Sequence, residues 1–160
     1  MRTNAADILN TPGYFYAVSY IFSCLVIIMT NRRRIRSWKA AAMHAGIFSL
    51  LLGFMILTDG VRSWLFIPSM CIIIALMLAD LFLGCEFTFL QACYYCLKAF
   101  INGEFAASLC WQIYYHFSKR LSVADSQLWK WLEIAVVYTV IYSFFYLLEK
   151  KLHQDTEELH

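Results

Sequence analysis

Two cysteines near the middle of the chain, Cys93 and Cys96, have the spacing of a redox pair or of half a metal site. A structural zinc site needs about four ligands, and no second pair stands nearby in the sequence. On a helix, residues three positions apart share a face, and free cysteine packs as a small apolar residue. We therefore expect packing residues here, and the sequence predicts no metal site and no cofactor.

Three ionisable residues stand close to membrane depth: Asp80, Lys98 and Glu104. Such groups are costly in hydrocarbon and usually face a bundle interior or a water-filled cavity. Asp80 stands just before Gly84, which predicts a residue at the membrane boundary. Lys98 is long enough to reach the interface, and Glu104 follows Gly103, which is typical of a residue that caps a helix start.

Polar residues recur through the segment 88–117. At 100° per residue, most of them fall within about one third of a helix circumference. We expect this stripe to face other helices or the interface rather than lipid. The candidates for a ligand or signal-transmission site are Lys98, Asn102, Glu104, Gln112 and His116.

The same segment allows two architectures. A continuous polar stripe favours one long, tilted helix, whereas the pair Asn102 and Gly103, a common turn former, favours a hairpin of two short spans. The first alternative gives five spans and the second gives six. The two alternatives also place the C-terminus on opposite sides of the membrane.

Composition sets the class of protein. The chain has 160 residues, 61% of them apolar and 15% charged, whereas a soluble domain usually has about 45–50% apolar and 25% charged residues. Four apolar runs, at 14–30, 40–57, 64–82 and 132–148, approach the length that a helix needs to cross a bilayer. The sequence therefore predicts an all-α fold, a polytopic transmembrane helix bundle that forms a single integral membrane domain over 1–160.

The loop 31–39 sets the expected orientation. It carries five basic residues and no acidic residue, and loops of this kind stay in the cytoplasm. We therefore expect a multi-pass cell-membrane protein with this loop in the cytoplasm and the N-terminus outside. Because the loop lies between two spans, we expect it to contact lipid headgroups and no nucleic acid. The topology residues are Arg32, Arg33, Arg34, Arg36 and Lys39.

Small residues form a stripe on the second apolar run: Ala42, Gly46, Ser49 and Gly53. Small residues at this spacing let another membrane helix approach closely. The stripe predicts either a tight neighbour within the bundle or the seam of a homodimer.

No catalytic motif is present: there is no glycine-rich phosphate loop, nucleophile elbow or pair of catalytic carboxylates. His44 and His116 have no recognisable partner, so neither is predicted as a phosphoacceptor. The sequence predicts no catalytic residue, and we expect a protein that is not an enzyme.

Two stretches resemble a known family. They are CEFTFLQACYYCLKAFI (85–101), continued by EFAASLCWQIYY (104–115), and the ending YLLEKKLHQDTEEL (146–159). Both resemble the N-terminal membrane sensor region of GHKL-type, peptide-sensing-like histidine kinases of Gram-positive bacteria. The resemblance implies a multi-span sensor followed by a dimerising helix and an ATP-binding domain, which this chain lacks. The spacing of Leu148, Leu152 and Leu159 is typical of a helix that continues, so we expect a chain truncated at its C-terminus.

Two functional hypotheses follow. The first is a membrane sensor or receptor domain that relays a signal, in a two-component system, to a histidine kinase module or response regulator outside this chain. The second is a small transporter or substrate-binding membrane component, because such proteins keep polar residues near the membrane midplane.

Overall fold

The structure is a computed structural model that describes residues 11–31, 38–58, 63–121 and 127–157. The described residues form five helices and no β-strand, as the sequence predicts. The helices are α2 (Gly13–Thr30), α3 (Trp38–Leu57), α4 (Ser63–Gly84), α5 (Phe89–Leu121) and α6 (Gln127–Glu157).

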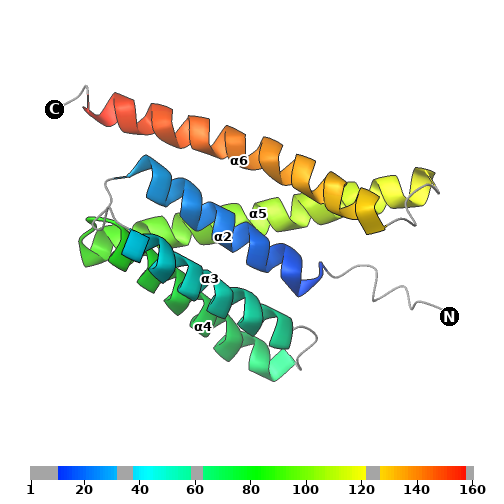
Figure 1. The fold of residues 1–160 in the computed structure, drawn as a ribbon, viewed down its shortest axis with the longest axis horizontal. Helices are drawn as coiled ribbons and strands as arrows, with labels where there is room; N and C mark the ends of the chain where they lie inside the picture. Colours follow the sequence, from blue (N-terminus) through cyan, green and yellow to red (C-terminus); the bar gives the residue numbers. More distant parts are fainter. Residues whose placement is uncertain (1–10, 32–37, 59–62, 122–126, 158–160) are drawn as a thin grey trace.

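Helix α2 is the centre of the bundle, because it contacts each of the other four helices. Successive helices run in alternate directions, so α2, α4 and α6 all point the same way (Figure 1). Helices α3 and α4 lie on one side of α2, and α6 lies on the other (Figure 1). The ends of α2, α4 and α6 and the starts of α3 and α5 consequently share one end of the bundle.

Four helices are long and apolar enough to cross a membrane, at Gly13–Thr30, Trp38–Leu57, Ile67–Gly84 and Trp131–Lys151. These segments match the four apolar runs predicted from the sequence, and they indicate a membrane protein. Helix α5 does not meet the same criterion, so four membrane-crossing helices are supported and the predicted count of five or six is not confirmed.

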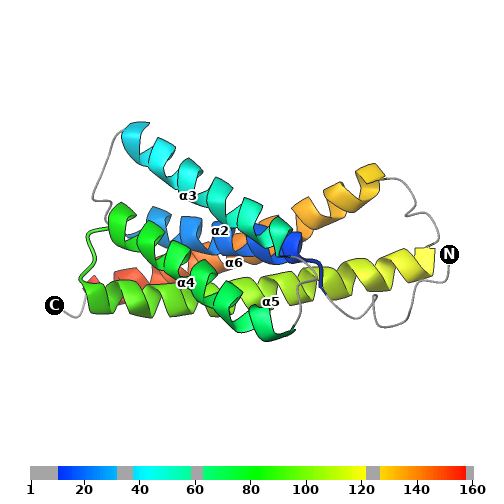
Figure 2. The same cartoon turned by 90° about the horizontal axis from the view of Figure 1, so that it is seen from below.

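Helix α5 is a single uninterrupted helix through Asn102 and Gly103, which settles the choice between one helix and a hairpin. Its 33 residues correspond to about 50 Å at 1.5 Å per residue, and it runs the length of the bundle (Figure 2). The helix starts with a capping box: Gln91 Oε1 accepts a hydrogen bond from Thr88 N at 2.9 Å, and Gln91 N donates to Thr88 Oγ1 at 3.4 Å.

A seam of small residues brings α5 against α2. A Cβ atom added to Gly103 would lie 2.6 Å from Cδ1 of Tyr20 on α2, so only glycine fits at this position without a shift. Glycine here serves the close approach of two helices rather than a turn. The seam repeats at alternating steps of four and three residues, and its buried members are Ala92, Cys96, Ala99, Gly103, Ala106 and Cys110.

The small-residue stripe of α3 has a different environment. Ala42, Gly46 and Ser49 are exposed, and a Cβ atom added to Gly46 or Gly53 would meet nothing within 4 Å. Within the described residues, no neighbour packs tightly on this stripe. The part of the bundle that the structure describes therefore gives no support to a tight neighbour inside the bundle, and the homodimer seam stays a prediction.

The core has two parts. The larger cluster joins α2, α3, α4 and the first half of α5 around Tyr20, Leu51 and Met77. The smaller cluster joins the start of α2 and the second half of α5 to α6, through Phe15 and Tyr138. Helix α6 thus belongs to a separate packing unit from the pair α3 and α4.

Candidate functional site

Buried polar contacts between helices form the candidate site. Ionisable or hydroxyl side chains join four pairs of helices within the bundle: α5 to α6, α2 to α5, α2 to α6 and α3 to α4. Polar groups inside a membrane bundle are expensive and usually functional.

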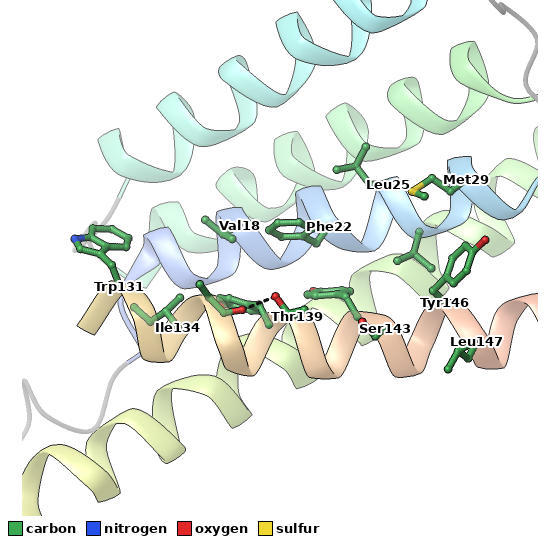
Figure 3. Close-up of a pocket in the computed structure, with 14 residues that line it drawn as sticks. Val18, Phe22, Leu25, Met29, Trp131, Ile134, Thr139, Ser143, Tyr146 and Leu147 are labelled. Carbon is green, nitrogen blue, oxygen red and sulfur yellow. Dashed lines mark hydrogen bonds between the residues drawn. The ribbon is translucent and has the colours of Figure 1, made fainter. Parts of the chain in front are cut away.

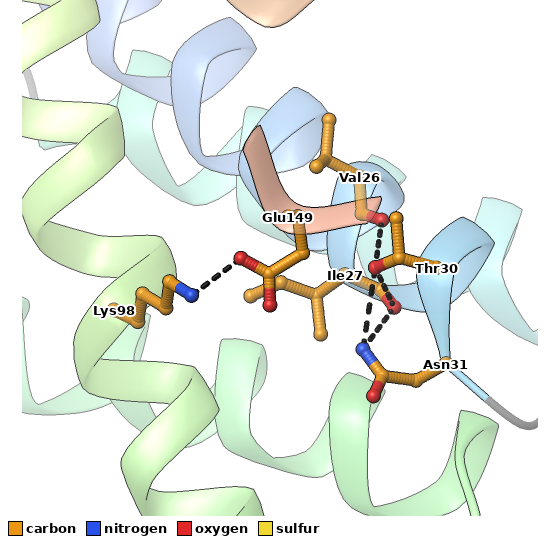
Figure 4. Close-up of polar contacts among 6 residues, drawn as sticks. All are labelled: Val26, Ile27, Thr30, Asn31, Lys98 and Glu149. Carbon is orange, nitrogen blue, oxygen red and sulfur yellow. Dashed lines mark hydrogen bonds and ion pairs between the residues drawn. The ribbon is translucent and has the colours of Figure 1, made fainter. Parts of the chain in front are cut away.

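Lys98 on α5 forms an ion pair with Glu149 on α6. The Lys98 side chain is 26% exposed and the Glu149 side chain 11%. Figure 4 shows Lys98 extending from its helix toward the Glu149 carboxylate. Glu149 lies within the membrane-crossing part of α6. The positive charge of Lys98 therefore offsets the cost of keeping the Glu149 carboxylate ionised there.

The same close-up contains the end of α2 (Figure 4). Asn31 Nδ2 donates to the carbonyl of Ile27 at 2.9 Å, and Thr30 Oγ1 donates to the carbonyl of Val26 at 2.9 Å. These bonds satisfy carbonyls that the end of a helix leaves without a backbone partner. Helix α2 is therefore closed by its own side chains in the region where Lys98 and Glu149 meet.

Glu104 lies in the middle of α5, where it accepts a hydrogen bond from the hydroxyl of Tyr20 on α2. The Tyr20 ring is fully buried and stacks on Phe100, with ring centroids 5.4 Å apart. The expectation that Glu104 caps a helix start is wrong, because α5 runs through this position without a break.

Two serines of α2 bind two tyrosines of α6 in a repeating pattern. Ser19 Oγ donates to Tyr138 Oη at 2.9 Å, and Tyr138 Oη donates to the Phe15 carbonyl at 2.9 Å. One turn further on, Ser23 Oγ and Tyr142 Oη are 3.2 Å apart, and Tyr142 Oη donates to the Ser19 carbonyl at 2.6 Å. These residues are not among the candidates predicted from the sequence, although both pairs stand four positions apart on apolar helices.

An apolar groove of about 730 Å³ runs between α2 and α6 beside these hydrogen bonds. Val18, Phe22 and Met29 line it from α2, and Ile134 and Leu147 line it from α6 (Figure 3). A mostly apolar groove with few hydroxyl groups suits an aliphatic or aromatic group better than a charged one.

His44 on α3 and Asp80 on α4 form a further polar pair, with 2.7 Å between His44 Nδ1 and Asp80 Oδ1. The Asp80 side chain is 0% exposed. Asp80 is therefore buried by protein, and the expectation that His44 has no partner is wrong. The sequence could not show this contact, since the two residues are 36 positions apart on different helices.

The remaining predicted residues do not converge on one site. Asn102 is half-buried, and Gln112 and His116 are exposed near the far end of α5. From Lys98 to His116 the axial distance is about 27 Å at 1.5 Å per residue, and the buried face of α5 is its small-residue seam. Among the predicted candidates, Lys98 is joined to α6 and Glu104 to α2.

The six cysteines are free. Cys96 is buried and its thiol donates to the carbonyl of Ile74 at 3.6 Å, so it packs α5 against α4. Among the described residues, no group of three or more His, Cys, Asp or Glu could hold a metal ion.

The topology residues Arg32, Arg33, Arg34 and Arg36 lie outside the described residues. Lys39 is exposed in the first turn of α3.

Comparison with known proteins identifies no relative. No protein-family model matches the chain, and neither curated proteins nor solved structures gave a significant match.

Proposed function

We propose that the chain is a membrane sensor or receptor domain in which α6 is the output helix, relaying a signal to a histidine kinase module or response regulator. The chain itself is not an enzyme in this proposal. The observation that carries it is the ion pair between Lys98 and Glu149. This pair ties α6 to the bundle where the helix leaves its apolar stretch and continues to Glu157.

The packing of α6 supports this role. In its membrane-crossing stretch, 11% of the residues are buried, compared with 50% in α2. A helix that buries few residues can move without breaking a large core. The contacts that hold α6 are directional hydrogen bonds and an ion pair, and these favour discrete positions over gradual drift.

The spacing of the tyrosines on α6 allows this helix a second discrete position against α2. Tyr138, Tyr142 and Tyr146 recur every four residues, and Ser19 and Ser23 repeat at the same step on α2, which runs parallel to α6 (Figure 1). If α6 slides by four residues, about 6 Å at 1.5 Å per residue, Tyr142 and Tyr146 take the partners that Tyr138 and Tyr142 have now. The slide replaces one set of hydrogen bonds by another and breaks the contact between Lys98 and Glu149.

The proposal includes an orientation of the bundle in the membrane. We propose that the 31–39 loop is cytoplasmic and that the N-terminus is outside. The polar end of α6 lies at the same end of the bundle as the start of α3 (Figure 1), so it is then also cytoplasmic, where a kinase module finds ATP. The proposal includes α5 as a fifth crossing, and the alternating directions of the helices support this (Figure 1).

The test is a fusion of the full chain to an autophosphorylating kinase module, assayed in membrane vesicles. Lys98→Met and Glu149→Gln each break the ion pair and are expected to change autophosphorylation several-fold in the same direction. The charge swap Lys98→Glu with Glu149→Lys is expected to restore the original level. Lys150→Met is the matched control, since Lys150 is exposed beside Glu149. Equal output from all variants would contradict the proposal.

A small transporter or substrate-binding membrane component is the second candidate. The groove between α2 and α6 favours it, because its volume fits a small apolar molecule. Uptake of labelled apolar solutes into proteoliposomes separates the candidates. Saturable uptake that Phe22→Trp blocks would favour the transporter, whereas uptake equal to that of protein-free liposomes would exclude it.

A further inference from the structure

A buried carboxyl group in the bundle has one oxygen without a partner. Asp80 Oδ1 lies 2.7 Å from His44 Nδ1, whereas Asp80 Oδ2 is buried and has no hydrogen-bond partner. The whole Asp80 side chain is 0% exposed, and His44 is 13% exposed. The pair therefore reaches the surface only through the imidazole.

The environment of the pair holds it in place. A Cβ atom added to Gly84 would lie 2.4 Å from His44 Cε1, so the imidazole lies directly against the backbone of α4. The ring also stacks on Phe48, with ring centroids 6.1 Å apart. The imidazole cannot turn away to make room for another ligand of Asp80 without leaving both neighbours.

Besides His44, the described residues place thiols near Asp80. Cys24 on α2 interacts electrostatically with Asp80 and with Cys85 and Cys96. These thiols belong to α2, to the residue after α4 and to α5, and all are buried. The nearest charged residues along α3 and after α4 are Lys39 and Glu86, and both are exposed. The described surroundings thus offer Asp80 Oδ2 no cation.

An ionised carboxylate is expensive in such a place. Burying a charge without full pairing costs far more than burying a neutral polar group. A neutral carboxylic acid still accepts the hydrogen bond from His44 Nδ1–H at Oδ1 and carries its proton on Oδ2. The unpartnered oxygen therefore favours the protonated form over an ion pair with His44.

We propose that Asp80 and His44 form a proton-binding site between α3 and α4, with the proton bound at Asp80 Oδ2. A hydronium ion donates the proton, an O–H bond forms at Oδ2, and water leaves. Loss of this proton places an anion in the apolar core beside the thiols. The contact between α3 and α4 then weakens, so the packing of these helices responds to pH.

Infrared difference spectroscopy of the full chain in lipid nanodiscs tests the site directly. The spectrum of the protein minus that of Asp80→Asn is expected to show the carbonyl band of a protonated carboxyl group at neutral pH, and this band should disappear on alkaline titration. Asparagine keeps the shape and the Oδ1 acceptor, so the variant is expected to fold. Glu149→Gln is the matched control and should leave the band unchanged.

Thiol labelling gives a second measurement that does not depend on the infrared assignment. Cys85 is fully buried next to α4, and its labelling is followed by mass spectrometry of the peptide that contains it. The labelling rate of the protein relative to Asp80→Asn is expected to rise several-fold as the pH becomes alkaline. The variant cancels the pH dependence of the thiol itself, because its Cys85 is the same.

Three results would overturn the proposal. The first is a carboxylate band at neutral pH in place of the acid band, which would make the pair an ion pair. The second is loss of the acid band when NaCl is raised at constant pH, which would make the ligand a metal cation. The third is a labelling ratio that does not change with pH. Both measurements report on the protonation of Asp80 and do not depend on the proposed sensor function.

Discussion

Lys98 and Glu149 join α5 and α6 across 51 positions of sequence by an ion pair at the edge of the bundle. Each charge stabilises the other, since an unpaired charge inside a membrane bundle is unfavourable. The pair thus connects α5 to the polar end of α6.

Breaking this ion pair should destabilise the bundle. Lys98→Met leaves Glu149 without its counter-charge, and we expect the free energy of unfolding to fall by about 1–3 kcal/mol, less than for a fully buried pair. Denaturation in detergent micelles, followed by circular dichroism, measures the change. Lys98→Met combined with Glu149→Met should regain most of the loss. A double variant as unstable as the single one would contradict this reading.

Gly103 and Gly46 offer a matched pair of substitutions. Gly103→Ala places a methyl group against the Tyr20 ring, which is confined by Phe100 and Glu104, and overpacking of this kind costs about 1–3 kcal/mol. Gly46→Ala meets nothing and should be neutral or stabilising by up to about 1 kcal/mol through helix propensity. Thermal unfolding in the same micelles compares the two. Equal effects would mean that α2 and α5 are not in close contact.

The repeat of tyrosines on α6 predicts a separation between stability and output. Tyr138→Phe removes a hydroxyl that bonds Ser19 and Phe15, so it should lower the free energy of unfolding by about 1 kcal/mol. Tyr146→Phe should leave stability unchanged but reduce the switched level of the kinase fusion, since only the displaced helix uses this hydroxyl. Tyr94→Phe, at an exposed position of α5, is the control. Unchanged output in Tyr146→Phe would exclude the four-residue slide.

The orientation of the bundle in the membrane can be measured at two positions that lie at the same end of the bundle. In a cysteine-free background, Ser37→Cys should resist an impermeant thiol reagent added to intact cells, because basic loops remain in the cytoplasm. Glu157→Cys should resist it as well, since α6 ends at the end of the bundle where α3 begins. Both positions should become labelled after the cells are permeabilised. Labelling of Ser37→Cys in intact cells would invert the topology.

The sequence predicts the helices better than their contacts. Apolar length predicts the four membrane-crossing helices, because lipid leaves a chain few other structures. The sequence alone could not decide whether α5 is continuous, since Asn102 and Gly103 are compatible with a turn as well as with a helix. In the structure, Gly103 instead allows the Tyr20 ring of the facing helix to lie close to α5.

The two small-residue stripes show the same limit. The stripe on α3 and the seam on α5 have the same alternating spacing in the sequence, yet within the described residues only the seam on α5 packs tightly against another helix. Similarly, His44 and Asp80 meet because α3 and α4 lie at a particular register. Register between helices depends on the shapes of both surfaces, so one helix read alone does not reveal it.

The central position of α2 has a consequence for biogenesis. Helix α2 is translated and inserted before the helices that it contacts. The tyrosine partners of Ser19 and Ser23 lie 119 positions later in the chain. Until α6 is inserted, these hydroxyls lack their tyrosine partners, and backbone carbonyls of their own helix are acceptors within their reach. Helix α2 must therefore stay inserted while part of its surface lacks its final partners. The bundle is complete only after α6 has been inserted.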